Sequence, residues 1–153
     1  MWLEDTGNRH GLCAAITVHN PIAQDEPTVA LSQVEEHRQL HEARITTLGA
    51  DKAYHQKKFV AGCRERAVAP HVACKEGIRV GGLDGHTTAR AGYRTSQRLR
   101  KRVEEIFGWM KTVGGLRRSR YRGVERTQAW AYFVAGTYNL LRITNLRMSK
   151  QAG

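Results

Sequence analysis

The sequence predicts a mixed α/β domain, and three observations lead to this fold class. Strand-like and helix-like segments alternate over residues 11–73, in the first half of the chain. In the second half, two segments carry apolar residues at the spacing of a buried helix face. The length of 153 residues, with 41% hydrophobic and 25% charged residues, is typical of one globular domain rather than of a disordered tail. One hydrophobic core is therefore expected.

The first half begins with a predicted strand, a helix and a second strand. Residues 11–19 are apolar with weak alternation, which is a strand pattern. Residues 29–43 have a helix-forming composition that no proline or glycine interrupts. Residues 44–51 are β-branched and apolar, and they predict a mostly buried strand that carries Asp51 at its C-terminal end.

A second helix and a third strand follow. Residues 56–65 are predicted to be helical, and residues 68–73 are predicted to form a strand with Pro70 at an edge or a bulge. Residues 75–92 are polar and rich in glycine, so they predict a connecting loop.

Two longer helices are predicted in the second half. The first covers about residues 95–112, capped by Thr95 or Ser96, and the glycine pair at 114–115 ends it. The second covers about residues 127–142. The apolar faces are expected to pack together, and they consist of Val103, Ile106, Phe107 and Met110 on the first helix and Trp130, Phe133, Val134, Tyr138 and Leu141 on the second.

The positive charge is concentrated in one part of the chain. The net charge is +11, yet residues 1–75 are balanced, whereas residues 88–126 hold twelve basic and three acidic residues. Such asymmetry is typical of proteins that bind a polyanion, although a solubilising surface is the plainer alternative. The residues expected to contact nucleic acid are Arg100, Lys111, Arg117, Arg118, Arg120, Tyr121 and Arg122.

The compartment is predicted from the cysteines and from the lack of targeting features. Cys13, Cys63 and Cys74 are odd in number and far apart, so they fit neither a disulfide framework nor a zinc site, and we expect buried thiols in a reducing compartment. No apolar run approaches the roughly 20 residues that a membrane span needs, and the first residues lack a signal-peptide pattern. A cytoplasmic protein without a membrane partner is expected.

The long basic helix carries two adjacent acids, which point about 100° apart around the helix axis. With Val103 at the centre of the apolar face, Glu104 falls with Arg100 and Lys111 in a polar stripe beside that face. Glu105 points to solvent. Glu104 is therefore the acid that can border a site.

Glu104 could meet Asp51 and share a divalent cation with it. Phosphodiester chemistry uses two such ions, and Mg²⁺ prefers carboxylate ligands. The alternative is structural: Glu104 pairs with a basic neighbour one helical turn away, and Asp51 caps a turn. His37 and His41 share a helical spacing but lack a third ligand, which indicates a solvated helix face rather than a zinc site.

Several motifs then point to one family. The second half contains the run RVEEIFGWMKTVGGLRRSRYRG, followed by the pattern W-A-x-x-x-A-x-T-Y-N-L, and the first half contains LGADKAYHQKKFV, PHVA and NRHGL. Together these motifs resemble the C-terminal catalytic part of bacterial insertion-sequence transposases of the DDE class. The resemblance implies a ribonuclease-H-like mixed sheet with flanking helices, in which two Asp and one Glu hold two Mg²⁺ ions that serve to cleave and rejoin DNA.

The resemblance also assigns roles to individual residues. Asp51 matches the second Asp of the family, and Glu104 matches its Glu, because Arg100, Glu104 and Lys111 reproduce the signature R-x3-E-x6-K. These two acids are the predicted catalytic and metal-binding residues. In the fuller signature a Tyr stands three residues before the Arg, whereas this chain has Gln97.

The first acid of the family has no match in this sequence. In such folds it lies on the first strand, many residues before the segment that residues 11–19 represent, and Asp5 matches no family motif. His55 stands where relatives often have an acid, which we interpret as non-catalytic variation. We therefore expect an incomplete sheet, with residues 1–146 forming a truncated DDE catalytic domain and residues 147–153 a C-terminal tail.

Two functional hypotheses follow. In the first, the chain is part of a metal-dependent transposase that cleaves and transfers DNA strands with Mg²⁺ or Mn²⁺ as the cofactor. Its partners are then double-stranded DNA at transposon ends and another transposase chain. In the alternative, it is a non-catalytic, basic DNA-binding remnant of a transposase.

Overall fold

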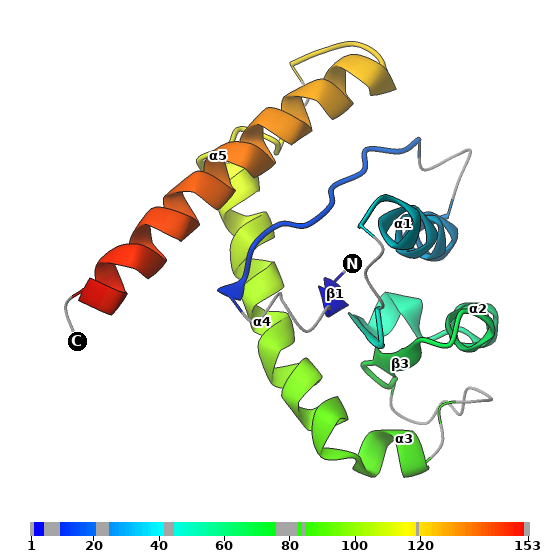
Figure 1. The fold of residues 1–153 in the computed structure, drawn as a ribbon. Coiled ribbons are helices and arrows are strands. Elements are labelled where there is room, and N and C mark those ends of the chain that lie inside the picture. The colour runs from blue at the N-terminus through cyan, green and yellow to red at the C-terminus, as the bar shows by residue number, and fades with distance from the viewer. Residues whose placement is uncertain are drawn as a thin grey trace.

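The computed structural model describes residues 2–4, 10–20, 25–41, 45–75, 83, 85–118 and 120–151. Figure 1 shows a small sheet between helices, with two long helices that cross at one side. In chain order the elements are β1 (Trp2–Glu4), α1 (Glu26–His41), β2 (Thr47–Ala50), the 3-10 turn η2 (Lys52–Tyr54), α2 (Lys57–Glu65), β3 (Ala69–Val72), α3 (Gly85–Ala89), α4 (Ala91–Thr112) and α5 (Val124–Gln151).

The sheet is mixed, which confirms the predicted α/β class. Its strand order is β1-β2-β3, with β1 antiparallel and β3 parallel to the central strand β2. Pro70 lies opposite Leu48 on the outer strand β3. Because the other side of β3 has no neighbouring strand in the sheet, the N–H group that proline lacks removes no hydrogen bond between strands. The strands predicted over residues 44–51 and 68–73 are both present, as β2 and β3, but each is shorter than predicted.

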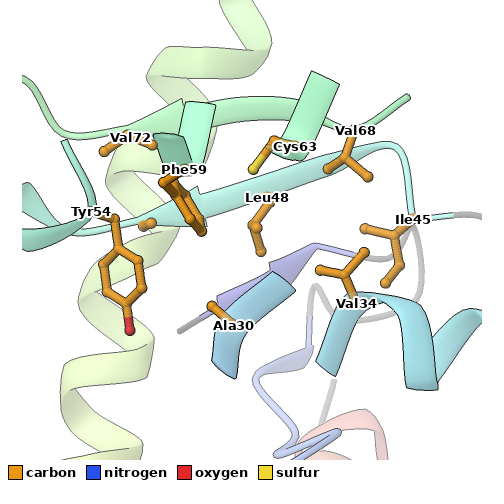
Figure 2. Packing of buried hydrophobic residues seen from close by; sticks show 10 residues of the cluster. Ala30, Val34, Ile45, Leu48, Tyr54, Phe59, Cys63, Val68 and Val72 are labelled. Carbon is orange, nitrogen blue, oxygen red and sulfur yellow. The ribbon is translucent and has the colours of Figure 1, made fainter. Parts of the chain in front are cut away.

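The main hydrophobic core lies between the sheet and helices α1 and α2 (Figure 2). Leu48 of β2 and Phe59 of α2 are fully buried there, and Tyr54 packs its ring against Phe59 with centroids 5.1 Å apart. We call this cluster the sheet core, and it consists of Ala30, Val34, Ile45, Leu48, Ala50, Tyr54, Phe59, Cys63, Val68 and Val72. Helix α4 contacts all three strands and lies on the other side of the sheet from α1 and α2 (Figure 1).

The two long helices pack together as predicted, but over a shorter stretch. Val103, Ile106 and Met110 of α4 meet Val134 and Ala135 of α5 in a second cluster. The helices cross rather than run side by side (Figure 1), so α4 covers only a short part of α5.

Three residues of the predicted apolar faces are therefore exposed instead of buried. Phe133 is 73% exposed and Leu141 49% exposed on α5, and Phe107 is 38% exposed on α4. Helix α5 is also longer at both ends than residues 127–142.

The first strand predicted from the sequence is not a strand. That segment runs extended beside α5, and side-chain amides take the place of a neighbouring strand. Asn139 accepts a hydrogen bond from the Cys13 N–H (2.8 Å) and donates one to the Cys13 carbonyl (2.9 Å). Gln128 accepts from the Val18 N–H (2.6 Å) and donates to the Ile16 carbonyl (2.9 Å). An amide side chain carries both a donor NH₂ group and an acceptor oxygen. It can therefore bond to a backbone N–H and a backbone carbonyl, as a neighbouring strand would.

The predicted loop over residues 75–92 is also partly wrong, because α3 and the start of α4 fall within its described part. Ser96 does not cap a helix, since α4 already begins at Ala91. Among the cysteines, Cys63 is buried as expected and burial raises its pKa to about 12, whereas Cys74 is exposed. Within the described residues, no helix combines the length and the apolar character that a bilayer crossing requires.

The end of α4 supplies a stability test. A Cβ atom at Gly114 would collide with the Val134 side chain and lie 2.7 Å from the Met110 carbonyl oxygen, whereas a Cβ at Gly108 would meet nothing within 4 Å. Gly114→Ala should therefore lower the free energy of unfolding by about 1 to 3 kcal/mol through overpacking. Gly108→Ala, inside α4, should raise it by up to about 1 kcal/mol. Urea unfolding curves compare the two, and equal effects would contradict this packing.

Candidate active site

Asp51 follows the last residue of β2 and stands at the C-terminal edge of the sheet. Its carboxylate Oδ1 accepts a hydrogen bond from the Ala53 N–H at 2.7 Å and so caps the 3-10 turn η2. The capping role of an acid at a strand end is therefore present. This cap uses only one acceptor position of the Asp51 side chain, and a carboxylate has two oxygens with about four acceptor positions.

Glu104 lies on α4, and its side chain is 60% exposed. One of its carboxylate oxygens pairs with the Arg100 guanidinium at 2.8 Å, one helical turn away. Such an exposed pair contributes little to stability, about 0.3 to 0.5 kcal/mol. Glu105 is exposed as well, and it does not line the cavity described next.

Asp51 and Glu104 line the same cavity, which has a volume of about 340 Å³. The cavity lies between the C-terminal edge of β2 and the middle of α4. Arg100 and Lys111 line it together with the two acids, so each acid has a cationic neighbour. The complete lining is Gly49, Ala50, Asp51, Tyr54, Arg100, Val103, Glu104, Phe107, Gly108 and Lys111.

The N-terminal half of α4 is fastened to β3, and this attachment sets where Glu104 lies relative to the sheet. Gln97 donates a hydrogen bond to the His71 carbonyl at 2.7 Å, and the Tyr93 hydroxyl donates to the Val72 carbonyl at 2.8 Å. His71 Nδ1 and the buried Ser96 hydroxyl share a third bond at 2.6 Å. Gln97, which stands where the family signature has Tyr, thus bonds to the sheet backbone and does not line the cavity.

The comparison with protein families decides the identity of the chain. A family model described as the transposase DDE domain matches residues 6–140. The chain belongs to this family. Membership implies a ribonuclease-H-like fold and a role in DNA transposition, which requires DNA binding and, in DDE transposases generally, a divalent metal ion. Neither the search of curated proteins nor the search of solved structures found a match.

The structure adds cavity residues of this transposase domain that the sequence analysis did not single out. Tyr54 and Phe107 are the clearest, since each also lines a neighbouring cavity of about 180 Å³. Burial raises the pKa of Tyr54 to about 12, and the negative charges of Glu26 and Asp51 and a hydrogen bond to Glu26 add to the shift. The Tyr54 hydroxyl therefore keeps its proton at neutral pH. Its position three residues after Asp51, within one turn, was the signal available in the sequence.

A basic cavity adjoins the one that the two acids line. It has a volume of about 520 Å³, and Lys111 belongs to both. Lys111, Thr112, Gly115, Arg117, Arg118 and Arg120 line it. Tyr121, at 43% exposure, is next in the chain and packs its ring against Trp130 with centroids 6.1 Å apart. Arg122 is exposed and lines neither cavity.

The two acids fit part of a metal site. Mg²⁺ is commonly held by one or two carboxylates, and waters and substrate phosphates complete its shell. Asp51 and Glu104 are two carboxylates that line one cavity, which is compatible with this requirement. In the part of the chain that the structure describes, no three His, Cys, Asp or Glu side chains gather closely enough to hold a metal ion. His55 is buried and accepts a hydrogen bond from the Lys75 N–H at 3.1 Å, a structural contact.

Proposed function

We propose that this transposase domain uses Asp51 and Glu104 to hold a divalent metal ion in DNA strand cleavage and transfer during transposition. The observation that carries the proposal is that the two acids line one cavity, although they come from a strand end and from a helix more than 50 residues later. A bound Mg²⁺ would activate an attacking oxygen or stabilise a leaving oxygen at phosphorus.

The cations around the two acids suit a phosphodiester substrate. Lys111 connects the acid-lined cavity with the basic one, so a DNA backbone lying across both would meet a positive charge beside the reacting phosphate. Arg100 holds Glu104 in place by its ion pair. Tyr54 retains its proton, so its hydroxyl can donate a hydrogen bond to a phosphate oxygen but cannot act as a base near pH 7.

Two carboxylates are fewer than the three that the family uses. We propose that the third carboxylate comes from a second polypeptide and not from an acid of this chain. Two-metal chemistry places one ion at the attacking oxygen and another at the leaving oxygen, so a missing ligand weakens at least one of these interactions.

The 153-residue chain alone is therefore expected not to nick DNA that carries the ends of its element, with either Mg²⁺ or Mn²⁺ present. A separate polypeptide that carries the family's first-Asp strand should restore metal-dependent nicking. Gel assays of end-labelled DNA measure both results.

Two results would overturn parts of this proposal. Nicking by the chain alone that Asp51→Ala abolishes would show that an acid of this chain, with Asp5 the first to test, supplies the third ligand. DNA binding without nicking in the complemented mixture would favour the second candidate, a non-catalytic DNA-binding remnant. The specific observation in favour of that candidate is the pairing of only two carboxylates in the described residues.

A further inference from the structure

The turn that follows Asp51 is bonded to Asp51 in two ways. The Ala53 N–H donates to the Asp51 carboxylate at 2.7 Å, and the Tyr54 N–H donates to the Asp51 carbonyl at 3.2 Å. Both donors belong to η2, a single 3-10 turn that ends at Tyr54. The direction in which the Asp51 carboxylate points therefore depends on how η2 is held.

The Tyr54 side chain anchors η2. Short 3-10 turns have poorer hydrogen-bond geometry than an α-helix, so a turn of three residues depends on its side chains for a fixed position. The Tyr54 ring is buried and extends from the turn beside Phe59 (Figure 2). Tyr54 also lines both the acid-lined cavity and the neighbouring cavity of about 180 Å³, which we call the small cavity. A contact that Tyr54 makes in the small cavity can thus reach Asp51.

Glu26 makes that contact from the first turn of α1. Its carboxylate accepts a hydrogen bond from the Tyr54 hydroxyl, and both side chains line the small cavity. A hydrogen bond to an ionised acceptor is roughly twice as strong as one between neutral groups. Ala30, one helical turn after Glu26, is buried in the sheet core, so the start of α1 is itself fixed against the sheet.

This bond uses the only proton that the Tyr54 side chain can donate. A phenol carries one O–H group. Burial, and after it the charges of Glu26 and Asp51, raise the pKa of Tyr54 to about 12, so the hydroxyl is a donor at neutral pH. Glu26 therefore sets the direction of this hydroxyl in the DNA-free chain. A phosphate oxygen would have to replace Glu26 as the acceptor to receive the proton.

We propose that Glu26 is a positioning residue for Asp51: through the Tyr54 hydroxyl it holds η2 so that the Asp51 carboxylate points into the acid-lined cavity. The inference rests on the proposed function, in which Asp51 binds the metal ion. Glu26 does not line the acid-lined cavity, so it acts through Tyr54 and not as a metal ligand. Arg100, which pairs with Glu104 at 2.8 Å, has the equivalent task for the second acid.

Two plainer roles of Glu26 make different predictions. A negative charge in the first turn of a helix stabilises that helix, so Glu26 could serve α1 alone. Its charge could also attract a cation to the site without any contact. The first role affects only the stability of the fold, and the second depends on the charge and not on the hydrogen bond. Glutamine separates these roles from positioning, because it keeps an acceptor oxygen but has no charge.

Mn²⁺ binding to the full chain, measured by electron paramagnetic resonance, is the first test. Glu26→Ala and Tyr54→Phe should each raise the dissociation constant about fivefold, less than the tenfold or more that is expected on loss of a group bonded directly to a metal ligand. The combined variant should bind no more weakly than either single variant, since both substitutions remove the same hydrogen bond. Glu26→Gln should stay within about twofold of the unsubstituted chain.

Glu36→Ala is the matched control. Glu36 lies on the same helix and is exposed like Glu26, but it lines neither the acid-lined cavity nor the small cavity. The substitution removes the same charge and should change the Mn²⁺ affinity by less than about twofold. Equal effects of Glu36→Ala and Glu26→Ala would contradict a specific role of Glu26.

The amide resonance of Ala53 gives a readout without metal. In an isotope-labelled chain it reports the bond from this N–H to the Asp51 carboxylate. Glu26→Ala and Tyr54→Phe should move the resonance upfield, because the amide proton is more shielded when its hydrogen bond is weaker. Glu26→Gln and Glu36→Ala should leave it in place. A role of Glu26 in stabilising α1 alone would leave the resonance unchanged in every variant.

The outcomes separate the role of Glu26 from the metal site itself. If the unsubstituted chain binds no Mn²⁺, the metal site is wrong, and the Ala53 resonance decides whether Glu26 holds η2. If the chain binds Mn²⁺ and Glu26→Ala binds it equally well, Glu26 does not position Asp51. A loss in Glu26→Gln as large as that in Glu26→Ala would assign the effect to charge. Circular dichroism checks folding, and Tyr54→Phe, which keeps the ring, decides the question if Glu26→Ala does not fold.

Discussion

Replacing either of the two acids should eliminate strand cleavage in the complemented assay, while replacing their neighbour should not. We expect Asp51→Ala and Glu104→Ala to lower the nicking rate by at least about a thousandfold, because the electrostatic stabilisation that a metal ion supplies in the transition state amounts to several kcal/mol. Glu105→Ala should change the rate by less than about threefold. Single-turnover kinetics with end-labelled DNA give these rates.

Glu105 is a close control because it shares the helix, the charge and the exposure of Glu104, yet does not line the cavity. Thermal unfolding should be nearly unchanged in Glu104→Ala and Glu105→Ala, since both glutamates are exposed. Asp51→Ala also removes the cap of η2, so it should lower the free energy of unfolding by about 0.5 to 2 kcal/mol. If Glu105→Ala abolished cleavage and Glu104→Ala did not, the assignment of the catalytic Glu would be wrong.

The second large effect concerns salt. If about six phosphates are contacted, the affinity for duplex DNA should fall by about a thousandfold between 50 and 200 mM salt, because each contact releases condensed counterions. Charge reversal of Arg117, Arg118 and Arg120, which line the basic cavity, should reduce the slope of log K against log salt by roughly three.

A matched control separates this local effect from the change in net charge. Reversing Lys57, Lys58 and Arg64 on α2 removes the same net charge from a helix that lines neither cavity. These three reversals should leave most of the slope intact. Binding that does not depend on salt, or equal changes of slope in both triple variants, would contradict a nucleic-acid interface at the basic cavity.

The sequence predicted best those features that depend on local pattern. A short apolar run that ends in an acid placed Asp51 after β2, and the helical spacing set Glu104 apart from Glu105. Each of these two predictions depends only on the periodicity of a single strand or helix and on which of its sides is buried. The pairing of Asp51 with Glu104 in one cavity depends also on how α4 is fastened to β3.

Features that depend on the partner of a segment could not be predicted from pattern. The alternating segment near Cys13 looks like a strand whether its backbone bonds to a strand or, as here, to the Asn139 amide. Ser96 has the residue type of a helix cap, yet it bonds to His71 inside the structure. Phe133 and Val134 are both apolar, and only the crossing of α4 and α5 determines which of them is covered.

Metal binding by the chain itself tests the central claim, that Asp51 and Glu104 hold one divalent ion, without any need for cleavage. Electron paramagnetic resonance of Mn²⁺ counts free ions in a titration. We expect weak, saturable binding whose dissociation constant rises about tenfold or more in Asp51→Asn and in Glu104→Gln but stays unchanged in Glu105→Gln, because each of the first two variants removes one carboxylate ligand. Equal binding by the Asp51→Asn variant and the unsubstituted chain would contradict the claim.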